Sequence, residues 1–382
     1  MTTPAITVEA LPAGYGDCLL ISCPVGRRTW RLLIDTGPDE CLPTLVDRLK
    51  AIPSNAQGTR RIDLAVISHI DHDHIGGAAR LFADKSLNLE FGDVWFNAPG
   101  RPGARGVGEG VGLAAVLGAT ACGLPWNLAF GGRDVVTGPK LFSEMPRRHE
   151  EPRITLLSPT RETLDALYRV WARALPKVKV RPEPEPIAAP RGGLDVEALA
   201  LIATPEDRAR ANGSSIAFLL EHGGASVLLT ADAFPSVLQH ALAALAVSRG
   251  QNLPWQLDLF KLSHHGSRGN TTSKLLDTVQ ARHVLVSTNG AIFGHPDPEA
   301  IARVVSKRTP GAEIWFNFRT TRTEVWADEQ LQAQFGYAAR LPSAAGTITS
   351  IHVGAIEGRA RFAKTRSTRK RSDVRPFLEG SR

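Results

Sequence analysis

The sequence predicts an α/β protein, because strand-like and helix-like patterns alternate along much of its 382 residues. Residues 64–67 form a short apolar run of the kind that makes a buried strand. Residues 41–51 instead have leucine and valine at helical spacing. Clusters of His and Asp follow several of the apolar runs, and α/β folds place their chemistry where strands end.

The expected elements follow in order from these patterns, with turns marked by Gly, Pro and Asn. In the first half, strands are expected at 5–11, 17–23, 30–35, 64–67 and 93–97, and helices at 41–51 and 78–84. In the second half, strands are expected at 154–158, 215–220, 226–230, 313–318 and 347–353. Helices are expected there at 161–174, at 234–247 and from Pro298 onward.

Composition sets the class of protein. The length allows one large domain or two ordinary ones, and no stretch is apolar for long enough to span a membrane. The N-terminus has no basic segment followed by an apolar one, so a secretory signal is not expected. The cysteines are sparse and lack CxxC spacing, which predicts reduced, mostly buried thiols in a cytoplasmic protein; they are Cys18, Cys23, Cys41 and Cys122.

The positive charge is concentrated near the C-terminus. The net charge is +7, and residues 359–375 hold eight basic residues against Asp373, which alone gives +7. We expect residues 356–382 to be a basic, flexible tail that could bind a polyanion such as nucleic acid. The alternative is a solvated terminus that serves only solubility.

The densest polar cluster follows the strand expected at 64–67. It places three histidines and two aspartates within six residues, namely His69, Asp71, His72, Asp73 and His74. Gly76 and Gly77 then allow a tight turn into a helix. So many imidazoles and carboxylates in one place are costly unless a cation compensates them, and zinc or manganese takes these ligands.

Further polar residues end apolar runs in the second half. Asp232 follows the strand expected at 226–230, and His264 and His265 follow another apolar run within a His-His-Gly-Ser sequence. His295 lies in a Gly-His-Pro sequence. In the first half, Asp35 ends the third strand in Asp-Thr-Gly, where it could orient a metal ligand or cap the turn.

These motifs resemble those of metallo-β-lactamase-fold hydrolases. The stretch from His69 to His74 is similar to the His-x-His-x-Asp-His signature of that family, with Asp71 where a second His is usual. The Asp form and the His-His-Gly-Ser motif are similar to the soluble domain of bacterial DNA-uptake (competence) channel proteins and its stand-alone relatives. The resemblance runs from Gly16 to Pro296 in the family's order.

The resemblance implies a metallo-β-lactamase-type αββα sandwich, in which two mixed sheets are flanked by helices. We expect residues 1–355 to form this hydrolase domain. An insertion or lid is expected at about 98–152, because its dense glycines and scattered arginines give no clear pattern. The Pro-rich stretch at about 176–194 is expected to be a surface linker within the domain.

The resemblance also implies a two-metal site. The expected ligands of two divalent ions, zinc or manganese, are His69, Asp71, Asp73, His74, Asp232 and His265. The expected catalytic residues are Asp73, His264 and His295. Which member of the histidine pair binds metal stays open, with the interpretation leaning to the second. His72 is expected to face substrate or support a ligand.

The favoured function is that of a metal-dependent phosphodiesterase or nuclease acting on DNA through a metal-activated hydroxide. Asp71 makes the site harder and more anionic than a second His would, so manganese should compete with zinc and phosphate esters should suit the site. One alternative is a hydrolase of a small-molecule ester, lactone or phosphodiester. The other is a degenerate metal-binding protein that acts through a partner.

Overall fold

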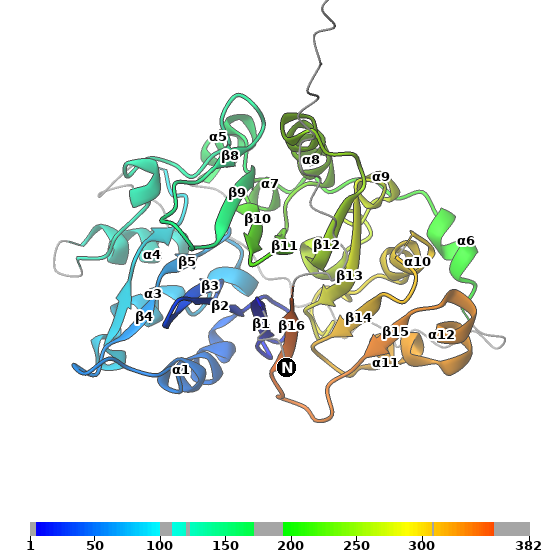
Figure 1. Cartoon of the computed structure of the whole chain (residues 1–382), viewed down its shortest axis with the longest axis horizontal. Coiled ribbons are helices and arrows are strands. Elements are labelled where there is room, and N and C mark those ends of the chain that lie inside the picture. Colours follow the sequence, from blue (N-terminus) through cyan, green and yellow to red (C-terminus); the bar gives the residue numbers. More distant parts are fainter. Residues whose placement is uncertain (1–4, 100–108, 120–122, 172–193, 308, 355–382) are drawn as a thin grey trace, which may run out of the picture.

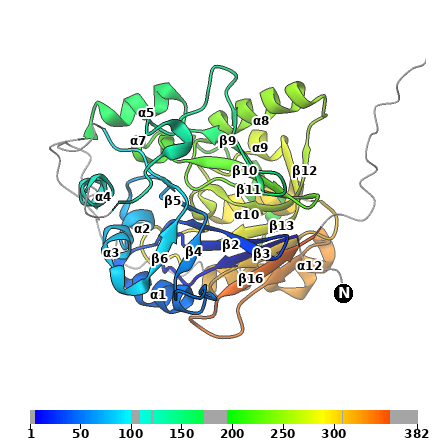
Figure 2. The same cartoon turned by 60° about the vertical axis from the view of Figure 1, so that its left-hand side comes forward.

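The computed structural model describes residues 5–99, 109–119, 123–171, 194–307 and 309–354. The expected basic tail, including 359–375, lies outside the described residues, as does the Pro-rich linker apart from Leu194. Two sheets form the centre of the molecule, and helices cover their outer faces (Figures 1 and 2). None of the helices in the described ranges has the length and apolar character that crossing a bilayer requires.

The first sheet has six strands in the order β16-β1-β2-β3-β5-β7. These are β1 (Ile6–Ala10), β2 (Leu19–Val25), β3 (Arg28–Ile34), β5 (Leu64–Val66), β7 (Val94–Trp95) and β16 (Thr349–Val353). The pairs from β16 to β3 are antiparallel, whereas β3, β5 and β7 run parallel. A separate parallel pair is formed by β4 (Arg60–Ile62) and β6 (Leu89–Phe91).

The second sheet has eight strands in the order β15-β14-β13-β12-β11-β10-β9-β8. These are β8 (Ser143–Glu144), β9 (Arg153–Ser158), β10 (Ala217–His222), β11 (Ala225–Leu229), β12 (Trp255–Lys261), β13 (Val279–Val286), β14 (Glu313–Phe316) and β15 (Ala338–Arg340). Strands β8 to β11 pair antiparallel, and β11 to β15 pair parallel. Both sheets are therefore mixed, as predicted.

The alternation of side chains along each strand builds three apolar layers. Leu19 and Ile21 of β2 point into the layer between the sheets, where they pack with Val227 of β11. Leu20, between them in sequence, points to the outer face and packs in the same apolar layer as Leu45 of α1 (Leu42–Lys50). Because each strand buries both of its faces, these strands read in sequence as nearly continuous apolar runs.

Helices cover each sheet on the side away from its partner. The first sheet is covered by α1 (Leu42–Lys50), α3 (Ala78–Ala83) and α4 (Glu109–Gly118). The second sheet is covered by α8 (Pro235–Arg249), α9 (Ser273–Leu276) and α10 (Pro298–Lys307). Shorter helices lie in the connections, at α2 (His72–Ile75), α5 (Arg161–Tyr168), α6 (Val196–Leu201), α7 (Arg210–Gly213), α11 (Thr321–Glu324) and α12 (Glu329–Phe335). This αββα arrangement is the predicted fold class.

The described parts of the expected insertion at 98–152 belong to the sandwich. Leu113 and Leu117 of α4 are buried in the outer layer of the first sheet, and β8 extends the second sheet. The first turn of α4 packs against the loop after β5, because a Cβ at Gly110 would lie 3.3 Å from the side chain of Ile70. Residues 100–108 and 120–122 of the insertion lie outside the described residues.

Candidate metal centre

The polar clusters of both halves of the chain meet where the strands end. His69 and Asp73 follow β5 of the first sheet. Asp232 follows β11, and His264 and His265 follow β12 of the second sheet. These strands end at the same edge of the sandwich, so residues far apart in sequence come together there.

Asp232 lies at the centre of the cluster and is 2% exposed. Its Oδ2 is 3.8 Å from Nε2 of His69 and 3.7 Å from Nε2 of His264. Its Oδ1 is 3.4 Å from Nε2 of His74 and 3.9 Å from Nε2 of His265. The two oxygens of one carboxylate thus face two different pairs of imidazoles.

We call the first set the outer group; it consists of His69, Asp71, Asp232 and His264. Nε2 of His69 lies 3.5 Å from Oδ2 of Asp71. The side chains of Asp71 and His264 are 31% and 21% exposed, so this group opens to solvent. The exposed edge gives a substrate access to the cluster.

We call the second set the inner group; it consists of Asp73, His74, Asp232 and His265, all of them buried. Oδ2 of Asp73 lies 3.2 Å from Nε2 of His265 and 3.7 Å from Nε2 of His74. Ligands held tetrahedrally about 2.1 Å from an ion lie about 3.4 Å apart, so these separations suit a shared cation.

Hydrogen bonds to the other ring nitrogen orient the histidines of the inner group. Nδ1 of His74 donates to Oδ2 of Asp35 at 2.8 Å, and Nδ1 of His265 donates to the carbonyl of Ser287 at 2.9 Å. Each Nε2 therefore presents a lone pair to the carboxylates, as a metal ligand does. Asp35 also accepts from the backbone and hydroxyl of Ser68, so it holds the ring of His74 in place, and its role in orienting a metal ligand stays a prediction.

The outer histidines are oriented in the same way. The hydroxyl of Ser68 donates to Asp35, so it accepts from Nδ1 of His69 at 3.0 Å. Nδ1 of His264 donates to Oδ1 of Asn270, also at 3.0 Å. Both rings consequently present Nε2 toward Asp232. We expected only one member of the His264–His265 pair to face a metal, whereas both present a suitable nitrogen.

Unpartnered atoms provide the test of whether cations fit. Within the described residues, Nε2 of His69, Nε2 of His74 and Oδ1 of Asp232 are buried without a hydrogen-bond partner. Each such atom costs about 1–3 kcal/mol when it is removed from water and left unpaired. Three of them converge on one place, and a donor set of imidazoles and carboxylates suits zinc and manganese. The residues present therefore fit divalent cations.

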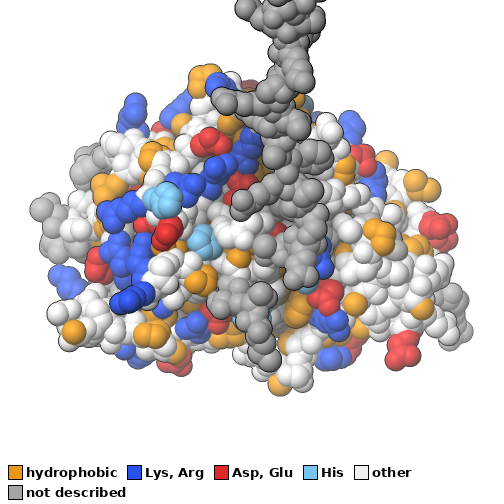
Figure 3. All heavy atoms as spheres, viewed as in Figure 1, with side chains coloured by type: hydrophobic (Ala, Val, Ile, Leu, Met, Phe, Trp, Pro, Cys, Tyr) orange, Lys and Arg blue, Asp and Glu red, His pale blue; other side chains and the backbone are white. Residues whose placement is uncertain are grey.

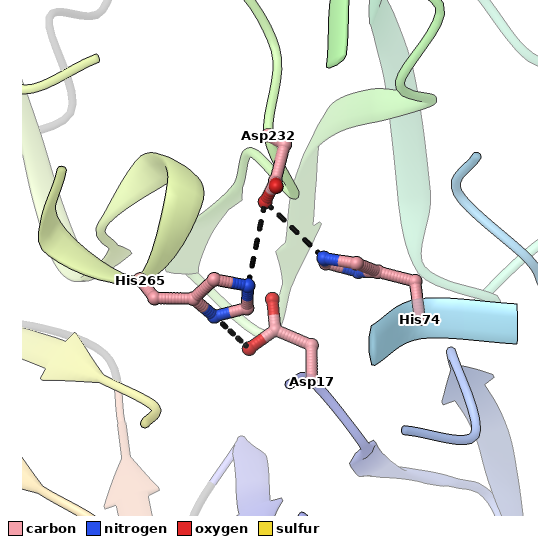
Figure 4. Close-up of side chains that lie close together, drawn as sticks. All are labelled: Asp17, His74, Asp232 and His265. Carbon is pink, nitrogen blue, oxygen red and sulfur yellow. Dashed lines mark ion pairs between the residues drawn. The ribbon is translucent and has the colours of Figure 1, made fainter. Parts of the chain in front are cut away.

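Asp17 is a member of the cluster that the sequence did not predict as a site residue. Asp17, His74, Asp232 and His265 bring ligand atoms within 4.8 Å of one another (Figure 4). Oδ1 of Asp17 lies 3.4 Å from Nδ1 of His265, the nitrogen turned away from Asp73. Its Oδ2 lies 2.5 Å from Nζ of Lys261. Asp17 therefore lies beside the Nδ1 side of the His265 ring. Its position also allows its carboxylate to approach a cation.

Lys261 and Asp17 form an ion pair beneath the site, and both side chains are at most 2% exposed. Burial would raise the pKa of Asp17, but Lys261 and His265 outweigh it and hold the pKa well below its usual range. The sequence carried a weak signal for this residue, because Gly16 and Asp17 form an early motif of the resembled family. No sequence signal indicated that Lys261 belongs to the site, because it lies in a segment with the pattern of a strand.

The backbone around the cluster adopts a conformation that L-residues rarely take. The residues Asp35, Ala231, His264 and His265 have φ of 56°, 43°, 49° and 55°. Such positions cost of order 1 kcal/mol each and persist where the surroundings hold them. The arrangement is thus set by the protein before any cation binds.

Without a bound cation, neighbouring charges and burial shift the pKa values of His264 and of two residues close to it, Asp207 and His295. Burial would lower the pKa of His264, but Asp232 and Asp207 outweigh it and raise this pKa to about 9. Burial would raise the pKa of Asp207, but His264 outweighs it and lowers that pKa to about 2. Burial lowers the pKa of His295, and the hydrogen bond with Asp297 offsets this only in part.

Two of the predicted residues lie beside the groups and not in them. The ring centroid of His295 is 5.1 Å from that of His264, and its Nδ1 is 3.5 Å from Asp297. His295 is therefore placed next to the outer group, one ring further out. The ring of His72 lies beside that of Tyr15, with the ring centroids 6.5 Å apart, and its expected place facing substrate stays a prediction.

Comparison with known proteins agrees with this architecture. The sequence model of the metallo-beta-lactamase superfamily matches residues 12–89, which include β2, β3, β5 and the loop from His69 to His74. The match covers about a fifth of the chain, and the two mixed sheets flanked by helices are consistent with the metallo-β-lactamase fold. None of the curated proteins compared with the chain matches it.

Two solved structures are similar at low identity. One is the metallo-beta-lactamase fold protein YhfI from Bacillus subtilis, at 12% identity and a TM-score of 0.41, covering 91% of this chain and 99% of that one. The other is CmlA, a diiron beta-hydroxylase from Streptomyces venezuelae, at 12% identity and a TM-score of 0.39. That match covers 92% of this chain but only 55% of CmlA.

Proposed function

We propose that the protein is a metal-dependent phosphodiesterase that cleaves nucleic acid, with DNA as the favoured substrate. The observation that carries this proposal is the shared position of Asp232, whose two oxygens face two separate sets of histidine and aspartate. A second cation beside the first suits the displacement of an oxygen at phosphorus, where both the entering and the leaving oxygen carry charge.

The proposed ligands of the inner cation are Asp73, His74 and His265, with Asp232 shared. The proposed ligands of the outer cation are His69, Asp71 and His264, with Asp232 again shared. When bound, such cations lower the pKa of a water molecule toward neutrality and offset the charge of a phosphate.

The side chains of the protein then have distinct tasks. Asp73 carries the carboxylate nearest to His265 and is the proposed group that orients the attacking water. His295 lies beside the outer group, where its ring is the proposed contact with a substrate phosphate. His264 was expected to donate a proton or contact substrate, but the hydrogen bond from its Nδ1 favours a ligand role.

Asp71 supports phosphate chemistry and manganese. With this residue the two groups contain three carboxylates, Asp71, Asp73 and Asp232, which together with four imidazoles form a harder set than an all-histidine outer group. Manganese favours carboxylate oxygen more than zinc does. We therefore propose that manganese supports activity at least as well as zinc.

The charge of the chain supports a polyanionic substrate. The tail at 359–375 accounts for the whole net charge of +7, and it is the proposed contact with nucleic acid. Lys and Arg also gather on one side of the face seen in Figure 3.

A groove of about 670 Å³ is lined by Arg147, Arg153 and His222. It is also lined by Glu150, Glu151 and Glu221, and it lies at the far end of β11 from Asp232, so the proposal does not use it.

A second candidate is a hydrolase of a small-molecule ester, lactone or phosphodiester. The narrow opening favours it, because Asp71 and His264 are the two proposed ligands with more than slight exposure.

We also propose a cytoplasmic location. It is supported by Cys18, Cys23 and Cys41, which are buried and free.

The test is cleavage of plasmid and single-stranded DNA by the purified full chain with manganese, zinc, magnesium or a chelator. Asp73→Ala should abolish cutting without loss of the fold, and Asp165→Ala, an exposed aspartate outside both groups, should cut normally. Cutting that persists in Asp73→Ala would overturn the proposal. Cation binding without cutting of any nucleic acid would favour the small-molecule hydrolase.

A further inference from the structure

Aromatic side chains from three separate segments meet beside the outer group. We call Tyr15, His72 and Phe293 the aromatic rim. The ring centroids of Tyr15 and Phe293 are 5.8 Å apart at an interplanar angle of 72°. Those of Tyr15 and His72 are 6.5 Å apart at 29°. One residue thus comes from the β1–β2 loop, one from α2 and one from the loop after β13.

The rim is joined to the proposed metal ligands through the chain and through contacts. His72 lies between Asp71 and Asp73 in sequence. The ring of Phe293 lies 6.3 Å from that of His295 at an interplanar angle of 26°, and His295 in turn adjoins the outer group. A ligand that lies on the rim therefore also reaches the exposed edge of the outer group.

The backbone beneath the rim is fixed. The amide of Asn289, in the loop that carries Phe293, donates to the carbonyl of Gly14 at 2.8 Å. Within the same loop, the amide of Gly294 donates to the carbonyl of Gly290 at 3.0 Å. On the other side, the amide of Asp17 donates to the carbonyl of Asp73 at 3.1 Å. A platform of this kind is ordered before a ligand arrives, which lowers the entropy cost of binding.

Phe293 is 40% exposed, and it is the aromatic member of the exposed large hydrophobic residues in the described part of the chain. Its ring meets that of Tyr15 at 72° and lies nearly parallel to that of His295 at 26°, and the exposed part of the ring is open to a further planar group. A positively charged side chain lies against the same loop: a Cβ at Gly290 would lie 3.2 Å from Cδ of Arg322. Arg322 makes no ion pair with any described residue. A ring face beside a cation matches a nucleotide, which joins a flat base to a phosphate.

We propose that the aromatic rim binds the nucleobase next to the phosphodiester that is cleaved, and that single-stranded nucleic acid is consequently the preferred substrate class. This inference rests on the proposed function. A base can stack on Phe293 only when it is not stacked within a duplex, so strand ends and single strands can use the rim and an intact duplex cannot. Arg322 would contact the phosphate on the other side of that base.

The experiment compares two labelled single-stranded DNA oligonucleotides of equal length, one with normal bases and one with abasic residues. Their affinities for the full chain are measured by fluorescence anisotropy with calcium, and their cleavage is measured with manganese. Phe293→Ala should weaken binding of the normal oligonucleotide about tenfold. It should leave the abasic one unchanged, and Phe293→Tyr should restore most of the affinity. Leu201→Ala, which removes an exposed side chain on α6, is the matched control.

The outcomes separate this inference from the proposed function. If the wild-type chain binds the two oligonucleotides equally, or if Phe293→Ala weakens both equally, the rim does not bind a base. If the chain prefers the normal oligonucleotide through Phe293 but cuts neither, the rim stands and the nuclease proposal fails. If the chain cuts DNA and Phe293→Ala changes neither affinity nor cleavage, the nuclease proposal stands and the rim fails.

Discussion

Lys261 shows how a residue outside both metal groups can limit the stability of the site. Its side chain is 1% exposed and its ammonium lies 2.5 Å from Asp17. A buried ion pair adds little to the stability of the fold compared with an apolar pair of similar size. Removal of one partner alone, however, leaves the other charge buried without that partner. The pair therefore matters most as a unit.

We expect Lys261→Met to lower the free energy of unfolding by about 3 kcal/mol, because the buried charge of Asp17 then loses its lysine partner and keeps only His265 beside it. The double variant Lys261→Met with Asp17→Asn should recover part of that stability. Urea denaturation in the presence of a chelator measures the single and double variants without a contribution from cations. Destabilisations that simply add in the double variant would show that the two residues do not act as a pair.

His264 allows the two roles considered for it to be distinguished. As a ligand of the outer group it should be needed for one of two cations, so His264→Gln should reduce the bound manganese from two ions per chain to about one. Metal analysis of the dialysed protein measures this, with His240→Gln on α8 as the control. Two retained ions together with a fall in kcat of about 10²–10⁴ would instead identify a proton donor.

At the same scale, motif residues could be predicted and their supporting residues could not. His69, Asp73, His74 and Asp232 are recognisable because each ends an apolar run within a short polar cluster. Asp17 and Lys261 are single charged residues whose partner is distant in sequence, and neither spacing nor period indicates such a contact. The choice between His264 and His265 also needed coordinates, because it depends on which way each ring points.

Among the elements, the β1–β2 loop and α2 depend on a close approach at one residue. A Cβ at Gly16 would lie 1.9 Å from the carbonyl oxygen of Asp73, a separation that no side chain can occupy. The loop and the helix that carries Asp73 and His74 can pack together only because this position is glycine.

We expect Gly16→Ala to push α2 away from the β1–β2 loop. The variant should be less stable by about 1–3 kcal/mol and bind the inner cation more weakly, since Asp73 and His74 move with the helix. Thermal unfolding and a chelator competition assay measure the two effects. Gly112→Ala, where the new Cβ would meet Ala79 at an ordinary 4.0 Å, should be neutral or slightly stabilising. A Gly16→Ala protein with wild-type metal affinity would contradict this account.

Most of the long elements could be predicted, and so could the short strands β5 and β7, which lie within apolar runs, whereas other short strands could not. The strands β2, β3, β9 and β11 and the helices α1 and α8 overlap the expected ranges, because runs of five or more residues display a period. The strands β4, β6 and β8 have two or three residues each, too few to show alternation. They form only because neighbouring chain segments supply a partner.

At the scale of the whole molecule, the net positive charge lies in the tail and not in the sandwich. The effect of salt on nucleic-acid binding should therefore depend on the tail. We expect deletion of residues 359–382 to weaken polynucleotide binding and to reduce the slope of log K against log salt by about 0.7–0.9 for each phosphate that the tail neutralises. Hydrolysis of a small diester should be unaffected, because Asp73 and the other proposed ligands remain. An unchanged salt slope would show that the tail does not bind nucleic acid.

The order of strands in the first sheet has a consequence for biosynthesis. β1 lies between β2 and β16, so one edge of β1 has no partner until Thr349–Val353, far later in the chain, has been made. Until that segment leaves the ribosome, the growing chain exposes the backbone of β1 as an open edge, the kind of surface on which chains pair with one another. Closure of this sheet pairs segments of great sequence separation, which fold slowly. Once it pairs with β1, the last described strand covers this open edge and removes a surface on which chains could self-associate.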